Sequence, residues 1–417
     1  MDNIKKNNIF LISFLFILVV SLFLGFFLNE DLSTGGSRWD FNQTWNVVIN
    51  FSNYNFHQYY NYTSHVPFHY IILSILYNLF NDQYIVRLIY LMFSFSLPLL
   101  LYLNLNKIYK CQKSLLLLFC FSLILFPFFR SMAIWPNAHL TASIFFLISN
   151  YFYLKGNAEN KLLYKYLNLL FLAFATYSMQ SYVVIFSFYL INYFLYHSKK
   201  EFMQLFLFCI LLAIPGLYLI SFNTRISNIT MTRNLSYSLA SNISLITFYL
   251  LFLINGKNLD FIKNKIIKFS KKEILIIFTL FLYAVINFTV YDTPMLGGGF
   301  FYKLSHLILG NNIIFFLSFL LGLFLCTIMI KEDRKFIYPL LIIFIMASNY
   351  IVFQKYYEPL FILLLTVFYK NYFIKNLLLN LKNISIFLLF VFLYFLSATI
   401  NQVANFTNNL SGVIRFF

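Results

Sequence analysis

The sequence predicts an all-α protein that is integral to a membrane, and three observations support this fold class. Of the 417 residues, 61% are hydrophobic and only 10% are charged. Apolar stretches of about 20 residues, the length that crosses a bilayer as a helix, follow one another from Ile9 onward. The basic residues stand in short clusters between these stretches. A soluble domain of this composition could not cover itself with polar surface, so we expect one polytopic membrane domain over residues 1–417.

The net charge of +17 does not indicate a nucleic-acid partner. The lysines cluster at the ends of apolar stretches, which is the pattern that the positive-inside rule produces for a chain in a lipid bilayer. The four cysteines have no spacing typical of metal ligands and lie in or beside apolar stretches. They predict neither a disulfide framework nor a zinc site.

The first apolar stretch, Ile9 to Leu28, follows Lys5 and Lys6 as a signal peptide would. It is too long for the hydrophobic region of such a peptide and lacks a small-residue cleavage site, so we expect a membrane anchor. The chain would then leave the cytoplasm near Asn29. Residues 29–83 are therefore predicted to form the first extracytoplasmic loop.

This loop belongs to the longest polar stretch of the chain, Glu30 to Arg87, but it is not featureless. Apolar residues recur at helical spacing after Asp40 (Phe41, Trp45, Val48, Ile49) and again after Pro67 (Phe68, Ile71, Ile72, Ile75, Leu79). Pro67 suits the first turn of a helix. Both segments are short for a span, so we expect two helices lying in the membrane interface.

Twelve further spans would follow, about thirteen in all. We expect them at about 84–105 and 114–129, in the stretches ending at Lys155, at about residue 179 and at Lys199, at about 202–222, before Lys257, in the stretch ending at Asp292, in the stretch ending at Lys331, at about 336–353, before Lys370, and after Lys382. On this topology the outer side holds six of the seven arginines (Arg38, Arg87, Arg130, Arg225, Arg233, Arg415) and only two lysines (Lys303, Lys355). Two explanations of this sorting stay open. One is chance in a small sample together with snorkelling of long side chains, and the other is phosphate recognition, to which the arginine fork is suited. No internal repeat is visible, which disfavours a transporter.

An ordered series of short motifs fills the first part of the chain. It runs Asp40, then His65-Val66-Pro67-Phe68-His69-Tyr70, Asn81-Asp82, Val86-Arg87-Leu88 and Lys107. This series resembles membrane glycosyltransferases of the GT-C superfamily, in the branch of the aminoarabinose transferase and the protein O-mannosyltransferase-like enzymes. Phe129-Arg130-Ser131-Met132 and Lys355-Tyr356-Tyr357-Glu358-Pro359 are similar to later landmarks of that branch. The first loop of the family often has two adjacent acids, where this chain has Asp40 alone.

The resemblance implies transfer of a sugar from a polyprenyl-phosphate donor to a cell-surface glycan or lipid, on the extracytoplasmic side of a bacterial inner membrane and with inversion. Such a transfer needs a base for the acceptor hydroxyl, and Asp40 is the candidate. The leaving phosphate needs cationic donors, for which Arg130, Arg225, Arg233, Lys303 and Lys355 are candidates. Tyr356, His65 and His69 complete the predicted substrate-binding set.

Several alternatives stay open from the sequence. Asp40 precedes a helical segment and could be only its N-cap, and the adjacent acids Glu30 and Asp31 are expected to tolerate amide replacement. His65 and His69, four residues apart, could hold a divalent metal or only make interfacial hydrogen bonds. A surface-polysaccharide polymerase is an alternative enzyme, although its dominant outer loop usually lies later in the chain. A flippase or transporter of lipid-linked oligosaccharide is the alternative from another class and would need charges buried within spans.

Overall fold

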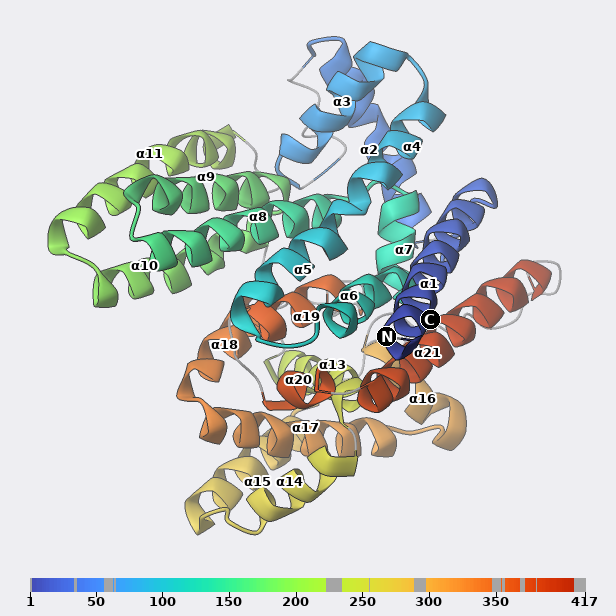
Figure 1. Cartoon of the computed structure of the whole chain (residues 1–417), viewed down its shortest axis with the longest axis vertical. Helices are drawn as coiled ribbons and strands as arrows, with labels where there is room; N and C mark the ends of the chain where they lie inside the picture. The colour runs from blue at the N-terminus through green and yellow to red at the C-terminus, as the bar shows by residue number, and fades with distance from the viewer. Residues whose placement is uncertain are drawn as a thin grey trace. The chain divides into compact units, whose positions relative to one another are not determined.

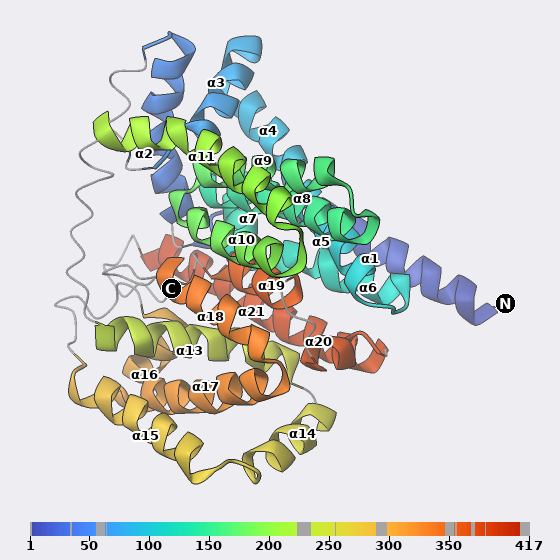
Figure 2. The same ribbon diagram turned by 90° about the vertical axis from the view of Figure 1, so that its left-hand side faces the viewer.

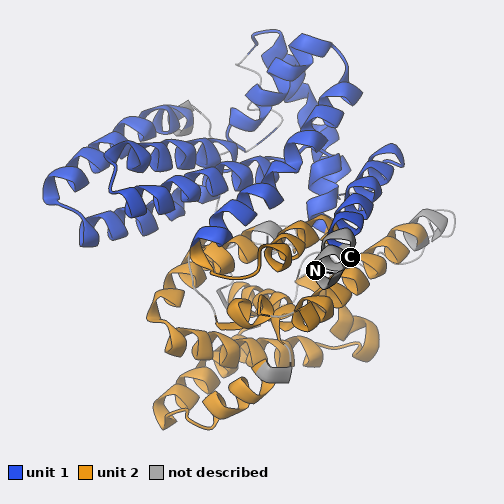
Figure 3. Ribbon diagram, viewed as in Figure 1, with its two compact units in different colours: residues 1–107, 128–230 blue, residues 108–127, 231–417 orange. Residues whose placement is uncertain are grey.

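The computed structural model describes most of the chain. The described residues are 2–33, 36–55, 63, 65–222, 235–254, 256–288, 298–346, 354, 357–367, 372–379 and 381–408. Within them every regular element is a helix, which confirms the all-α class. The chain divides into two compact units, residues 1–107 with 128–230 and residues 108–127 with 231–417 (Figure 3). The prediction of one membrane domain stays a prediction.

Unit 1 contains the N-terminal helices and a bundle of long helices (Figure 1). Its elements are α1 (Asp2–Phe27), α2 (Gly36–Ser52), α3 (Phe68–Phe80), α4 (Gln83–Ser94), α5 (Ser96–Ile108), α7 (Pro127–Ile134), α8 (Ala138–Glu159), α9 (Leu162–Ser178), the 3-10 helix η3 (Gln180–Val184), α10 (Ile185–Tyr196) and α11 (Lys199–Phe222). Buried amides join the bundle: Asn104 of α5 accepts a hydrogen bond from Asn150 of α8 at 3.0 Å, and Asn168 of α9 donates to the backbone oxygen of Ser149 at 3.0 Å. Such interhelical hydrogen bonds hold helices together where lipid weakens the hydrophobic drive between them.

Unit 2 contains the remaining helices (Figure 2). They are α6 (Lys113–Phe121), η2 (Ser122–Leu125), α13 (Leu235–Leu253), α14 (Gly256–Ile266), α15 (Lys271–Ile286), α16 (Gly299–Leu309), α17 (Ile313–Glu332), η4 (Arg334–Phe336), α18 (Ile337–Met346), α19 (Glu358–Val367), α20 (Tyr372–Leu377) and α21 (Leu381–Asn408). Helices α13 and α17 lie side by side, and Gly322 makes their close approach possible. A Cβ atom at Gly322 would lie 2.1 Å from the Thr247 hydroxyl, which donates to the Ser318 carbonyl at 3.0 Å.

The predicted count of thirteen spans is not confirmed. In the described part of the chain, four helices are long and apolar enough to cross a membrane: Gln83–Ile108, Lys199–Leu219, Ile313–Glu332 and Leu381–Val403. A fifth is added if Lys113–Leu125 and Pro127–Ile134, bent by 68°, are taken as one span. Several other predicted spans correspond to shorter helices, such as the 12-residue α10 and the 10-residue α18. A helix of 12 residues extends only about 18 Å, less than the hydrocarbon core of a bilayer.

Candidate functional site

The start of α2 is fixed by side chains that precede it in the chain. The Asp31 carboxylate accepts hydrogen bonds from the backbone N–H of Ser33 at 3.0 Å and of Arg38 at 2.8 Å. The Ser33 hydroxyl accepts from the backbone N–H of Ser37 at 2.7 Å. Asp31 is 5% exposed, and burial raises the pKa of its carboxyl group. The helix is therefore capped by Asp31 and Ser33, whereas Asp40 is its fifth residue, so the alternative that Asp40 is the N-cap is wrong.

An ion pair between Glu30 and the buried Arg130 joins the residue before Asp31 to α7. The Arg130 guanidinium donates to the two Glu30 carboxylate oxygens at 2.6 and 2.9 Å, and to the hydroxyl and the backbone oxygen of Ser21 at 3.0 and 2.8 Å. Arg130 is 1% exposed. The role of Arg130 as a phosphate ligand stays a prediction. In this structure its Nε and Nη2, which could bind a phosphate, donate to Glu30 instead. The expected tolerance to amide replacement is at odds with the pairing of Glu30 with Arg130 and with the burial of Asp31.

A second guanidinium, that of Arg87, stacks on the ring of Trp135, directly after α7. The Arg87 guanidinium carbon lies 3.6 Å from the centre of the Trp135 ring, and the Arg87 Nε donates to the Ile134 carbonyl at 3.2 Å. Trp135 in turn donates its indole N–H to the Glu30 carbonyl at 2.9 Å. Arg87 is 7% exposed. It therefore fastens α4 to α7, which fits an anchor better than a substrate ligand.

Asp40 belongs to the second turn of α2, the helix that these contacts hold in place. It is half-buried on α2, and its charge acts on the hydroxyl of Tyr70 in α3. The Tyr70 hydroxyl lies 3.3 Å from the Thr63 hydroxyl. Burial, with a smaller contribution from the Asp40 charge, raises the pKa of Tyr70 to about 12. Tyr70 therefore stays protonated at neutral pH.

His69, next to Tyr70 in α3, is fully buried. Its Nδ1 lies 2.8 Å from the Thr141 hydroxyl, which lies 2.9 Å from the Tyr90 hydroxyl. Burial lowers the pKa of His69 to about 3, and the neighbouring His65 adds to the effect. The ring of His65 lies 6.3 Å from that of His139, between ring centres. His69 is thus neutral and positions α3 against α8.

The remaining predicted site residues lie in unit 2 or outside the described residues. Arg225, Arg233, Lys355 and Tyr356 lie outside the described residues. Lys303, on α16 of unit 2, has no ion-pair partner among the described residues, and burial lowers its pKa to about 8. Its role in phosphate binding stays a prediction. No group of three or more His, Cys, Asp or Glu side chains that could hold a metal occurs in the described ranges.

Sequence reasoning missed two buried charged clusters because their members are far apart in the chain. In unit 1, Lys165 is completely buried and donates at 3.1 Å to Glu201 and at 3.1 Å to Asn160. In unit 2, Glu358 is 1% exposed and accepts a hydrogen bond from the hydroxyl of Tyr394. The Tyr394 hydroxyl also accepts from the side chain of Gln354 at 2.9 Å. In the sequence, Lys165 is marked only by its position near a helix end, whereas Glu358 belongs to the Lys355-Tyr356-Tyr357-Glu358-Pro359 motif but carries no sign that it is buried.

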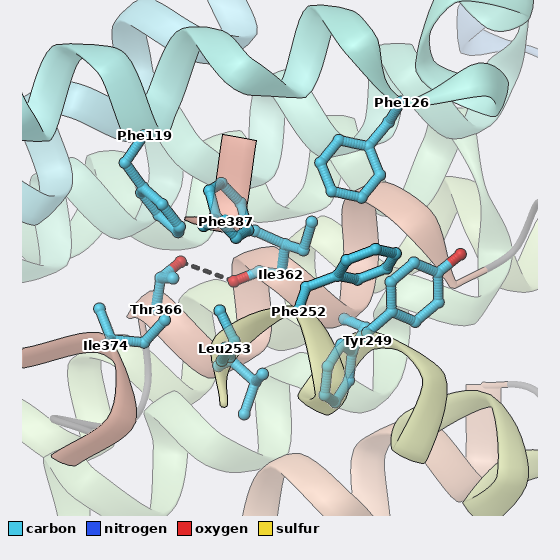
Figure 4. Close-up of a pocket in the computed structure, with 11 residues that line it drawn as sticks. Phe119, Phe126, Tyr249, Phe252, Leu253, Ile362, Thr366, Ile374 and Phe387 are labelled. Atoms are coloured by element: carbon cyan, nitrogen blue, oxygen red, sulfur yellow. Dashed lines mark hydrogen bonds between the residues drawn. The ribbon is translucent and has the colours of Figure 1, made fainter. Parts of the chain in front are cut away.

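Unit 2 also contains a small apolar pocket (Figure 4). Phe119, Phe126, Phe252 and Phe387 form much of its wall. The hydroxyl of Thr366, which also lines it, donates to the backbone oxygen of Ile362 at 2.6 Å. A pocket with such walls offers no acid, base or phosphate ligand, so we do not expect catalysis of group transfer in it.

No family model, curated protein or solved structure matches this chain. The site is therefore interpreted from its own geometry. It consists of a half-buried carboxylate beside a protonated tyrosine, on a helix held in place by buried charges.

Proposed function

We propose that this protein is a membrane glycosyltransferase that moves a sugar from a polyprenyl-phosphate donor to a glycan or lipid acceptor, with Asp40 as the general base. One observation carries the proposal. Of the four carboxylates in the polar stretch, Glu30 is paired with Arg130, Asp31 caps α2 and Asp82 caps α4. Asp40 instead lies half-buried in the second turn of α2, where its charge acts on the hydroxyl of Tyr70 in α3.

The proposed reaction is a single displacement. The acceptor hydroxyl oxygen attacks the anomeric carbon of the donor while its proton passes to the Asp40 carboxylate. The bond between the anomeric carbon and the phosphate oxygen breaks, and the electron pair leaves with the polyprenyl phosphate. Attack from the face opposite the phosphate inverts the anomeric centre. Tyr70 keeps its own proton at neutral pH, so Asp40, and not Tyr70, is the base.

The surroundings of Asp40 support this assignment. Neighbouring Phe41 packs against Trp135 with ring centres 5.9 Å apart, which holds this part of α2 in place. A base on a helix that is held in this way loses little entropy when the acceptor binds. The cations that would bind the leaving phosphate, with Arg225, Arg233, Lys303 and Lys355 as candidates, stay predictions.

The test is the replacement Asp40→Asn, with Asp82→Asn as the matched control, because Asn at position 82 can still cap α4. The purified proteins in nanodiscs would be given radiolabelled polyprenyl-phosphate hexoses and pentoses, with envelope fractions as acceptor. We expect Asp40→Asn to fold and to lose transfer by about a hundred-fold or more, the effect of a lost general base. Near-parental turnover in a folded Asp40→Asn protein would overturn the assignment.

A further inference from the structure

The outward face of α2 has a composition that differs from that of a membrane-facing helix. Its exposed residues are Arg38, Trp39, Asn42, Gln43 and Asn46, and the last four follow a spacing that places them on one side of the helix. Trp39 is 63% exposed. The apolar side chains of the same helix point the other way, since Phe41, Val47 and Val48 are at most 2% exposed.

This face does not suit burial in lipid. An interfacial helix needs an apolar stripe that enters the acyl region. On α2 that stripe is already used against the protein. The neighbouring α3 supplies the contrast, because it leaves Ile75 and Leu79 55% and 69% exposed. We therefore revise the expectation from the sequence for α2, whose outward side is polar with a single indole.

From this surface we infer that the outer face of α2, with Trp39 at its N-terminal end, binds a pyranose oligosaccharide, the acceptor of the proposed reaction. A pyranose ring has a face of C–H groups that stacks on an aromatic plane, and its rim of hydroxyls pairs with planar amides. Trp39 supplies the plane, and Asn42, Gln43 and Asn46 supply amides one turn and two turns further along. Gln43 lies four residues after Trp39 and three after Asp40, so it connects the platform to the carboxylate.

Only the statement that the oligosaccharide is the acceptor rests on the proposed function. Binding of the oligosaccharide can be measured without any donor. The chain has three tryptophans. Trp135 is 4% exposed and Trp45 stacks edge-on against Tyr77 at 5.4 Å between ring centres. The difference between the fluorescence of the parent protein and that of Trp39→Phe therefore reports Trp39.

The experiment uses the full-length protein in nanodiscs and a printed library of pyranose oligosaccharides. We expect the parent to bind members of the library and Trp39→Ala to bind them about ten-fold or more weakly, because an aromatic anchor contributes much of the binding free energy at such a site. Tyr54→Asn is the matched control, because Tyr54 is 80% exposed just beyond α2 and Asn tolerates its positive φ of 57°.

Three results would overturn the inference: no library member binds the parent, Trp39→Ala binds as the parent does, or Trp39 fluorescence is quenched by dibrominated phosphatidylcholine in the nanodisc. The last result would make Trp39 a membrane anchor. Failure of the proposed function is a separate outcome. It would show as unchanged transfer in Asp40→Asn while the Trp39-dependent binding persists.

Discussion

Helices α2 and α3 are neighbours in the first polar stretch, pack against each other and yet present opposite surfaces. Outward from α2 point Trp39, Asn42 and Asn46, whereas α3 exposes Ile75 and Leu79. Both helices show apolar residues at helical spacing in the sequence. The difference teaches that periodicity reveals a helix with an apolar side but does not say whether protein or lipid covers that side.

The two helices are also anchored by different physics. At the start of α2, charged groups fix the chain: the Asp31 cap and, beneath it, the ion pair of Glu30 and Arg130. The first turn of α3 is held by the neutral contact of His69 with Thr141. Acid should therefore affect the two anchors differently, and the following predictions probe each anchor and then each face.

The largest effect is expected at the anchor of α2. Arg130→Ala leaves the Glu30 carboxylate without its partner, and breaking a buried pair in this way costs about 3–5 kcal/mol. The free energy of unfolding, measured by titration from dodecyl maltoside into sodium dodecyl sulfate micelles, should fall by that amount. A loss below about 1 kcal/mol would show that the pair is not essential to the fold.

A smaller change tests the same pair without removing a charge. A Cβ atom at Gly25 would lie 2.7 Å from Glu30 Oε2 and 2.8 Å from Arg130 Nη2. Gly25→Ala should therefore destabilise by about 1–3 kcal/mol through overpacking. In the Arg130→Ala background the same substitution should cost less, because the crowding nitrogen is absent. Equal costs in both backgrounds would contradict this explanation.

The anchor of α3 should give a pH dependence. The pKa of His69 is lowered to about 3 in the folded protein, against about 6.5 when unfolded. Below pH 6.5 the unfolded chain binds the proton first, so stability is lost as the pH falls, by about 2 kcal/mol at pH 5. His69→Gln should be less stable at pH 7 but should lack this component between pH 7 and pH 5. The same titration repeated at several pH values measures it, and parallel curves for the two proteins would exclude His69 as the cause.

The two outward faces should respond differently to an added charge. Leu79→Asp places a carboxylate on the apolar face of α3, where contact with lipid makes it cost about 1 kcal/mol or more. Asn46→Asp places the same charge on the polar face of α2 and should change stability by less than about 0.5 kcal/mol. Thermal unfolding in nanodiscs compares the two variants. Equal destabilisation would mean that both faces meet the same surroundings.

The smallest effect on stability is expected where the effect on binding is greatest. Trp39→Ala removes an exposed side chain without leaving a cavity, so the free energy of unfolding should change by less than about 0.5 kcal/mol. The measurement is the same thermal unfolding. A large loss would assign Trp39 to the fold and would account for lost oligosaccharide binding without a platform.

Local signals in the sequence located several elements correctly. The Asn81-Asp82 turn ends α3 with Asn81 at a φ of 51° and starts α4 with the Asp82 carboxylate as its cap. Pro67 is the N-cap of α3, one position before the first turn in which it was expected. These features depend on neighbouring residues only, and short-range rules describe them well. The number of spans was harder to predict, because an apolar helix of 10 to 17 residues and a span have similar composition.

The sequence by itself determined the all-helical class, the membrane-compatible composition and the polar stretch that contains Asp40, since all three follow from residue type and spacing. Tertiary structure alone decided which carboxylates are structural. Arg130 pairs with Glu30 across 100 residues, and Asp31 caps α2, so both of these acids have structural roles, whereas Asp40 is half-buried within α2. Tertiary structure also decided that the polar side of α2 faces outward. Long-range pairing of charges and burial of one helix face depend on what packs against the chain, and no local pattern records that.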